Sequence, residues 1–151
     1  MRVSDIMSTE VVTVGIDATI EEVAKLLTEK NISGAPVVNH ANRVVGMVTH
    51  KDLLYKDMEP RFPAAVELLG GFIYLQGVHR YNEELRKLAA TKVEDIMTRE
   101  VITVSESTEI EDVARLMVDK AINRVPVLKE DKLVGIVSRA DVVKYIAKIM
   151  E

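Results

Sequence analysis

The chain contains one sequence pattern twice, and this duplication limits its possible folds more than any other feature. Residues 3–14 begin Val-Ser-Asp-Ile-Met and end Val-Val-Thr-Val, and residues 93–104 repeat this order as Val-Glu-Asp-Ile-Met and Val-Ile-Thr-Val. Residues 46–52, Gly-Met-Val-Thr-His-Lys-Asp, return as residues 135–141, Gly-Ile-Val-Ser-Arg-Ala-Asp. A copy of about 50 residues would bury only a marginal core alone, so we expect the copies to pack together. Clefts between such copies are places where small ligands bind.

Composition excludes several classes of protein. The 151 residues include no cysteine, which rules out disulfides, thiolate zinc sites and cysteine nucleophiles. The net charge of −4 gives no reason to expect a nucleic-acid partner. The N-terminus lacks the apolar run of a signal peptide, and the apolar stretch near residues 68–75 is too short to span a membrane. We therefore expect a cytoplasmic protein with neither nucleic-acid nor membrane partners.

The hydrophobic pattern predicts a β-α-β-β-α order in each copy. In the first copy, residues 11–14 read as a strand, and apolar residues at helical spacing follow from Ile20 to Leu27. Two strands around the turn at residues 40–42 and a helix from His50 complete the unit. The second copy has the same order, with its last helix from Arg139 to the C-terminus. The expected topology is a parallel crossover followed by a hairpin, in an α/β fold with two pseudo-twofold repeats.

The sequence offers two alternative N-caps for the first helix of the first copy. Asp17 and its counterpart Ser107 are good N-cap residues before the first helix of each copy. Thr19 with Glu22 is a competing register, because a hydroxyl followed three residues later by Glu forms a capping box.

The segment from Tyr55 to Thr91 separates the two copies. It is too long and too rich in Leu, Phe and Tyr for a passive tether, and residues 81–90 read as a polar helix. It packs over the surface of the paired repeats, or it is a lid or partner-binding element. The expected division is repeat 1 at residues 1–58, a helical insertion at 59–91 and repeat 2 at 92–151.

The two Gly-x-Val-Thr/Ser-x-x-Asp motifs are the best candidates for a binding site. Thr49 and Ser138 stand where a strand ends and a helix begins, and exposed N–H groups there can hold a phosphate. Asp52 and Asp141 follow one turn later, and a carboxylate can accept two hydrogen bonds from the vicinal hydroxyls of a ribose. The alternative is a capping box, in which each aspartate reaches back to the helix start.

Catalytic motifs are absent from the sequence. No phosphate-binding Gly-x-x-x-x-Gly-Lys-Ser/Thr loop, dinucleotide Gly-x-Gly-x-x-Gly loop or Gly-x-Ser-x-Gly nucleophile elbow occurs. The histidines His40, His50 and His79 are dispersed without ligand-like spacing. We expect no enzyme activity, no bound metal and no cofactor.

The order and spacing of these motifs, seen twice, resemble tandem CBS domains, also called a Bateman module. The resemblance covers nearly all of the chain except residues 55–91 and is closest to stand-alone CBS-pair proteins with an insertion between the repeats. It implies an adenosyl ligand in the clefts, such as AMP, ADP, ATP or S-adenosylmethionine, and a disc-shaped homodimer. With no effector domain in the chain, it also implies an unidentified effector protein as partner. The resulting hypothesis is a non-catalytic sensor, and the alternative is a structural or dimerisation module with vestigial pockets.

The resemblance also implies roles for particular residues. Thr49 and Asp52 would grip phosphate and ribose in one cleft, and Ser138 and Asp141 in the other. Residues 34–37 and 124–127 would line the adenine pockets, and the threonines of the first strands would close them. The implied ligand-binding residues are Thr13, Ala35, Pro36, Val37, Thr49, Lys51, Asp52, Thr103, Arg124, Val125, Pro126, Val127, Ser138, Arg139 and Asp141.

The two copies differ at the position where the family often places a phosphate-binding arginine. The second copy has Arg124 there, and the first has Gly34. Arg139 adds a second positive charge near the second site, while His50 and Lys51 partly compensate near the first. We expect the Asp141 cleft to prefer charged nucleotides, because a guanidinium donates to phosphate through a planar fork. The alternative role for Arg124 is a surface ion pair with Glu130 or Asp131.

Overall fold

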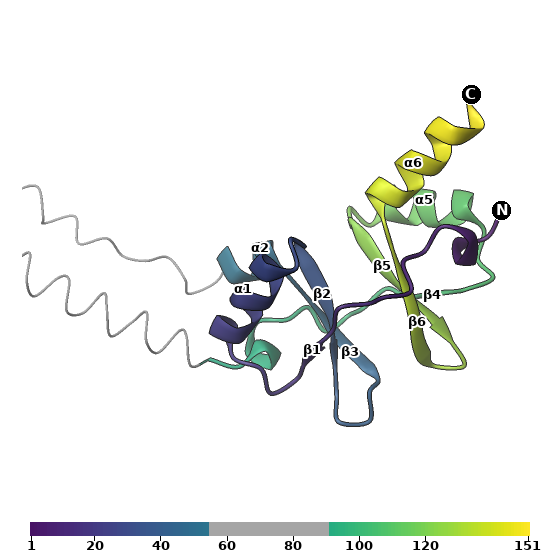
Figure 1. Ribbon diagram of the computed structural model, residues 1–151. Coiled ribbons are helices and arrows are strands. Elements are labelled where there is room, and N and C mark those ends of the chain that lie inside the picture. Colours follow the sequence, from purple (N-terminus) through teal and green to yellow (C-terminus); the bar gives the residue numbers. More distant parts are fainter. Residues whose placement is uncertain (55–90) are drawn as a thin grey trace, which may run out of the picture.

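The computed structural model describes residues 1–54 and 91–151, which form two similar halves (Figure 1). The first half contains η1 (Val3–Asp5), β1 (Val14–Gly15), α1 (Ile20–Glu29), β2 (Gly34–Val38), β3 (Val44–Thr49) and α2 (His50–Leu54). The second contains η2 (Val93–Asp95), β4 (Val104–Ser105), α5 (Ile110–Asp119), β5 (Arg124–Lys129), β6 (Lys132–Ser138) and α6 (Arg139–Ile149). The predicted α/β fold of two β-α-β-β-α repeats is confirmed. The predicted helical insertion and its two interpretations lie outside the described residues, apart from Thr91.

Each half carries a three-stranded sheet with the same topology. In the first half β1 pairs parallel with β2, and β2 pairs antiparallel with β3. The order β4-β5-β6 repeats this arrangement in the second half. The hairpin turns contain residues with positive φ, Asn42 at 58° and Asp131 at 63°, a conformation that Asn and Asp tolerate better than most residues. The parallel crossover followed by a hairpin is therefore present in both copies.

The first strand of each half is shorter than the sequence suggests. Only Val14 and Gly15 pair with β2, although the β-branched run begins at Val11. Further back, Ser8 pairs with Ile136 of β6 through two hydrogen bonds of 2.9 Å. The chain must therefore cross from the second sheet to the first between residues 8 and 14, which removes residues 11–13 from the sheet.

The helix starts decide between the two registers that the sequence left open. Thr19 is the N-cap of α1, with a reciprocal capping box between Thr19 and Glu22. In the second half Ser107 is not the cap, because its hydroxyl pairs with that of Ser105, and α5 begins after Glu109 without a side-chain cap. The competing register was right in the first copy.

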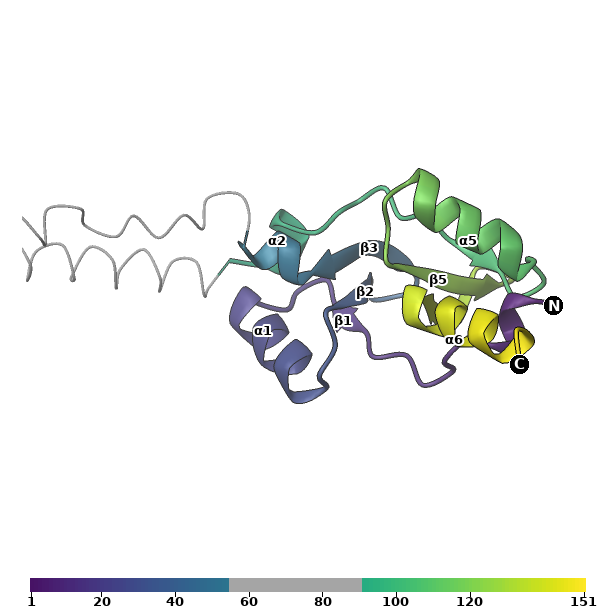
Figure 2. The same cartoon turned by 90° about the horizontal axis from the view of Figure 1, so that it is seen from above.

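Each half completes its hydrophobic core with a segment from the start of the other copy. Val3 packs among α5, β5, β6 and α6, and its backbone N–H donates to the Thr108 carbonyl at 2.8 Å. In the same way Val93 and Met97 pack with β2, β3 and α1, and the Val93 N–H donates to the Ala18 carbonyl at 2.8 Å. Figure 2 shows the N-terminal segment beside α5 and α6, away from β1 and α1. The two halves are therefore interlocked.

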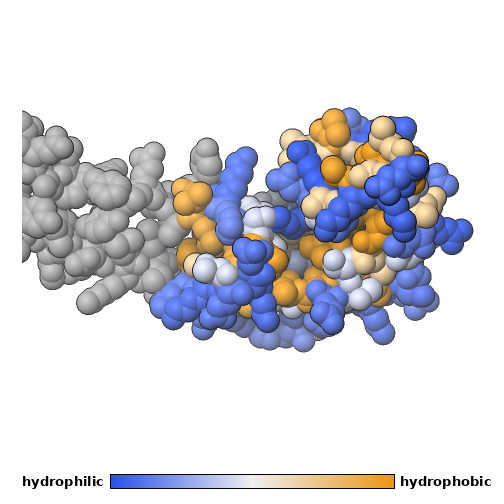
Figure 3. Space-filling view, turned by 45° about the horizontal axis from the view of Figure 1, so that its top comes forward, coloured by the Kyte–Doolittle hydropathy of each residue, from blue (hydrophilic) through white to orange (hydrophobic). Residues whose placement is uncertain are grey.

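Apolar side chains remain exposed on one side of the second half. Figure 3 shows hydrophobic residues gathered over the region of α5 and α6. The exposed large side chains there are Val118, Val143, Ile146, Ile149 and Met150. Within the described part of the chain, no helix is both long and apolar enough to cross a membrane.

Candidate functional site

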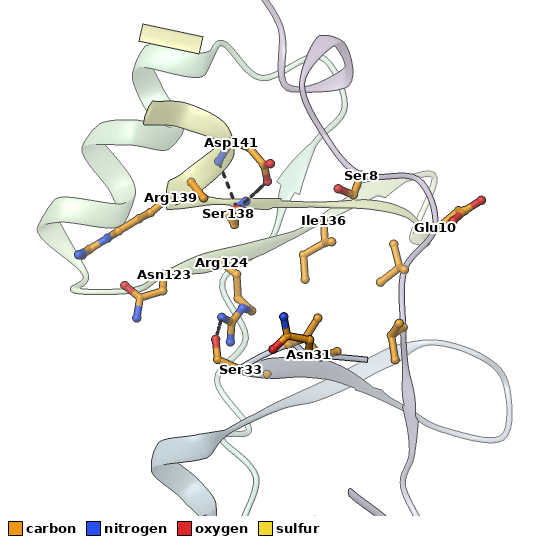
Figure 4. A pocket seen from close by; sticks show the side chains of 15 residues that line it. Ser8, Glu10, Asn31, Ser33, Asn123, Arg124, Ile136, Ser138, Arg139 and Asp141 are labelled. Atoms are coloured by element: carbon orange, nitrogen blue, oxygen red, sulfur yellow. Dashed lines mark hydrogen bonds between the residues drawn. The ribbon is translucent and has the colours of Figure 1, made fainter. Parts of the chain in front are cut away.

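Two clefts lie between the halves, and each takes residues from both. The first, named here the Ser138 cleft, has a cavity volume of about 490 Å³ (Figure 4). Its walls are the chain before β1, the loop that leads into β2, the start of β5 and the start of α6. Its lining residues are Ser8, Glu10, Val11, Val12, Asn31, Ile32, Ser33, Gly34, Asn123, Arg124, Ile136, Ser138, Arg139, Ala140 and Asp141.

The second cleft, named here the Thr49 cleft, is built from the equivalent parts with the halves exchanged. Its cavity volume is about 370 Å³. The chain before β4, the loop that leads into β5 and the start of α2 form its walls. Its lining residues are Ser33, Met47, Thr49, His50, Lys51, Thr98, Glu100, Val101, Ile102, Ala121, Ile122, Asn123 and Arg124. The pseudo-twofold repeat therefore produces two related clefts.

The Ser138–Asp141 pair forms a capping box at the wall of its cleft. One carboxylate oxygen of Asp141 accepts hydrogen bonds from the Ser138 N–H at 2.8 Å and the Ser138 hydroxyl at 2.7 Å. The Asp141 N–H donates to the Ser138 hydroxyl at 3.3 Å. All three bonds involve Oδ2 or the backbone, so within the described residues Oδ1 has no partner. Capping and ligand binding are compatible here, because capping occupies only one of the two oxygens.

The Thr49–Asp52 pair has similar geometry but a different place. The Thr49 N–H and hydroxyl donate to Asp52 Oδ2 at 2.9 and 3.3 Å. Thr49 lines its cleft, whereas Asp52 is not among the lining residues. The capping contact is thus formed in both copies, and only in the second does the aspartate also line its cleft.

Arg124 lies between the two clefts. Its Cα is paired with Ser138 in the β5–β6 register, and its guanidinium donates to the Ser33 hydroxyl of the other half (Figure 4). Burial lowers the pKa of this guanidinium, which nevertheless stays charged at neutral pH. The alternative ion pair with Glu130 or Asp131 is not formed, and no ion pair of Arg124 occurs within residues 1–54 and 91–151. A half-buried cation without a carboxylate partner favours an anionic ligand.

Arg139 lines the Ser138 cleft but its guanidinium is directed to the end of α5. Its Nε donates to the Ile122 carbonyl at 3.2 Å and one terminal nitrogen donates to the Met117 carbonyl at 3.3 Å. In Figure 4 the side chain extends away from Arg124. A cation at a helix C-terminus stabilises the helix, so this contact accounts for Arg139 without a ligand.

Most of the predicted adenine-wall residues lie behind the clefts. Ala35, Val37, Val125 and Val127 have no exposed surface and belong to the two cores. Pro36 and Pro126 are buried as well, and none of the six lines either cleft. Only the first residue of each segment lines a cleft: Gly34 lines the Ser138 cleft, and Arg124 lines both clefts.

The clefts are lined by the residues that precede Thr13 and Thr103, and the two threonines themselves are not part of the lining. Val11 and Val12 line one, and the equivalent Val101 and Ile102 line the other. These four residues lie just before β1 and β4, outside both sheets.

Sequence reasoning missed the loops that precede β2 and β5. Residues 31–33 line the Ser138 cleft and residues 121–123 line the Thr49 cleft, with Ser33 and Asn123 shared by both. Both loops directly precede the segments predicted as adenine walls, 34–37 and 124–127, and this equivalent placement could have predicted them as cleft residues. No group of three or more metal-ligating side chains occurs in the described ranges.

Comparison with known proteins gives matches in both halves of the chain. The family model of the CBS domain matches residues 3–59 and 93–148. The uncharacterized protein MJ1426 of Methanocaldococcus jannaschii is 32% identical over 152 residues, covering 95% of this chain and 90% of that protein. The chain spans less than half the length of two other curated relatives, 42% and 32%.

Two solved structures are similar and contain adenosyl compounds. One is the CBS domain pair of protein MJ0100 in complex with 5-methylthioadenosine and S-adenosyl-L-methionine, with a TM-score of 0.72, 27% identity and coverage of 99% of this chain and 98% of that one. The other is CBSX2, a CBS-pair protein of Arabidopsis thaliana, in complex with AMP, with a TM-score of 0.73, 27% identity and coverage of 99% and 98%.

Proposed function

The chain belongs to the CBS-domain family as a tandem CBS pair, and from this premise we propose that it is a non-catalytic regulatory module that binds an adenosyl ligand in the clefts between its repeats. The similar pairs of MJ0100 and CBSX2 were solved with S-adenosylmethionine, methylthioadenosine and AMP, which share an adenosine. AMP, ADP, ATP and S-adenosylmethionine are the candidate ligands for this chain.

The observation that carries this proposal is the Arg124 guanidinium beside Ser138 and Asp141, which forms no ion pair with any residue of 1–54 or 91–151. A phosphate in the Ser138 cleft would receive hydrogen bonds from the guanidinium and would lie beside the start of α6, an eleven-residue helix whose N-terminal dipole favours an anion. The Oδ1 atom of Asp141 would accept hydrogen bonds from the ribose hydroxyls. Glu10 lies at the edge of this cleft, and in Figure 4 its carboxylate is directed away from Arg124.

The adenine would contact apolar side chains of both halves. Val11, Val12, Ile32 and Ile136 supply apolar surface to the Ser138 cleft, and buried apolar area is the main source of affinity for a flat ring. Residues 35–37 and 125–127 would support this apolar surface from behind, since none of them lines a cleft. Thr13 and Thr103 would act only through their neighbours.

The output of binding would go to another protein. A regulatory shift requires a ligand that binds two states of the module unequally. The exposed apolar side chains on α5 and α6 would pair two copies into the expected homodimer, and an effector protein in the cytoplasm would read the changed dimer.

A structural module with vestigial pockets is the second candidate. It is favoured by the capping box of Ser138 and Asp141 and by the bonds from Thr49 to the Asp52 carboxylate, which give both aspartates a structural role without a ligand. In that case the apolar faces would serve dimerisation alone.

Thermal unfolding with and without AMP, ADP, ATP and S-adenosylmethionine separates the two candidates. A ligand that binds only the folded chain at 100 times its dissociation constant adds about 2.7 kcal/mol to the free energy of unfolding, so the midpoint must rise. Guanosine monophosphate serves as the matched control for the base. A midpoint that does not move with any adenosyl compound leaves the structural module as the function.

A further inference from the structure

The sequence difference between Arg124 and Gly34 has a steric cause. These residues occupy equivalent positions, paired in register with Ser138 and Thr49 respectively. A Cβ atom added to Gly34 would meet the Arg124 guanidinium, and it would approach the Val48 carbonyl oxygen to 2.8 Å and Thr49 Cγ2 to 2.9 Å. The space near the pseudo-twofold axis therefore holds one large side chain, and the glycine makes room for it.

The guanidinium of Arg124 is shared by both clefts. Arg124, Ser33 and Asn123 are the residues that line the Ser138 cleft and the Thr49 cleft alike. The hydrogen bond from Arg124 to Ser33 holds the side chain across the boundary between the halves. A phosphate in either cleft would thus approach the same cation, although the clefts are otherwise separate.

From this geometry we infer that the two clefts are negatively coupled for phosphorylated ligands, because one guanidinium serves both. This inference rests on the proposed function. The phosphate of AMP carries close to two negative charges at pH 7, more than one guanidinium neutralises. A first AMP would draw the guanidinium into its own cleft, and the phosphate of a second AMP would then lack this donor. Since coupling is reciprocal, it does not depend on which cleft fills first.

The coupling should be absent for ligands without phosphate. Adenosine has no anion to draw Arg124, so its binding in one cleft should leave the other unchanged. Lys51 and Arg139 each line only one cleft, so neither links the two in this way. A partner that reads the chain would then distinguish one bound nucleotide from two over a wide range of concentration.

Single-cleft variants give the test. Val11 and Val101 are equivalent residues of the two copies, and each lines one cleft. Val11→Trp fills the Ser138 cleft and Val101→Trp fills the Thr49 cleft, with Val12→Trp and Ile102→Trp as a second pair should either of the first variants unfold. Calorimetric titration with AMP gives the affinity of each cleft alone, and their sum predicts the wild-type titration for independent sites.

We expect the second AMP to bind the wild-type chain at least about fivefold more weakly than that sum predicts. In the Arg124→Ala background, and with adenosine in any background, the titrations should equal the sum. A wild-type AMP titration equal to the sum overturns the inference, as does a deviation that persists in Arg124→Ala or a cleft that binds no AMP when it is alone. These results leave the proposed function standing where adenosine binds, whereas no binding of AMP or adenosine to any variant overturns both.

Discussion

Val3 and Val93 occupy the same position in the two repeats, and each is fully buried in the core of the opposite half. The chain thus begins in the second half, crosses to the first, and returns after the insertion to complete the first before it builds the second. Neither half has a complete core without the other. This interlocking links each cleft to the core of the opposite half, because each cleft contains the crossing segment that follows one of these valines.

Substitution of Val3 should disturb the half that is distant from it in sequence. Val3→Ala removes two buried methyl groups, so the free energy of unfolding in urea should fall by about 1–3 kcal/mol. Amide chemical shifts should change in β5 and β6, which contact Val3, more than in β2 and β3. Val93→Ala is the matched variant and should give the reverse pattern. Shift changes confined to the near half in sequence would contradict the interlocked arrangement.

Gly34 should tolerate no side chain, in contrast to Gly15. Gly34→Ala forces a Cβ against the Val48 carbonyl and the Arg124 guanidinium, and such overpacking typically costs about 1–3 kcal/mol. Gly15 has nothing within 4 Å of an added Cβ, so Gly15→Ala should leave the urea midpoint close to that of the wild type. The double variant Gly34→Ala with Arg124→Ala should recover only part of the loss, because the Val48 contact remains. Equal midpoints for the two single variants would contradict this account.

Local sequence patterns were enough to predict the elements of the fold. The apolar spacing from Ile20 to Leu27 places Ile20, Val23 and Leu27 in the core, and turn residues between β-branched runs identify the hairpins. The same patterns carry no information on which core the Val-x-Asp-Ile-Met segments complete, because both copies have nearly the same segment. Exchange of these segments is a property of chain connectivity, and it is visible only in the structure.

The sequence predicted several residues of the candidate site, but it did not predict how all of their side chains are placed. Ser138 and Asp141, which share a motif, come together in one cleft with Arg124, whose place there was implied by the family resemblance. Asp52 lies outside the lining of the equivalent cleft, and Arg139 bonds to the end of α5. Motif spacing fixes the position of a residue on its element, but the direction of a long or capping side chain depends on neighbours distant in sequence.

Arg139 should contribute mainly to the stability of the fold, and Arg124 mainly to AMP binding. Arg139→Ala removes two hydrogen bonds to carbonyls at the end of α5, so the free energy of unfolding should fall by about 1 kcal/mol. Its AMP affinity should fall less than that of Arg124→Ala, which removes the unpaired cation between the clefts. Arg115→Ala is the control, an exposed arginine that pairs with Asp112 at 3.8 Å, and it should change neither quantity measurably. The opposite order of AMP affinities would show that Arg139 turns into the cleft to bind phosphate.

Asp141 should have a ligand-binding role that an equivalent capping residue lacks. Asp141→Asn replaces the carboxylate of a residue that lines the cleft, and hydrogen bonds to a charged group are worth about 1.5–3 kcal/mol, so adenosine affinity should fall at least about tenfold. Glu22→Gln makes the same change of carboxylate to amide in the capping box of α1, away from both clefts.

Both Asp141→Asn and Glu22→Gln should lower the unfolding free energy by a similar amount, about 1 kcal/mol or less, because each weakens one capping box. Only Asp141→Asn should lose adenosine affinity in calorimetric titration. Asp52→Asn should lose less than Asp141→Asn, since Asp52 does not line its cleft. Adenosine binding that is equally strong in Asp141→Asn and Glu22→Gln would leave the capping box as the whole role of Asp141.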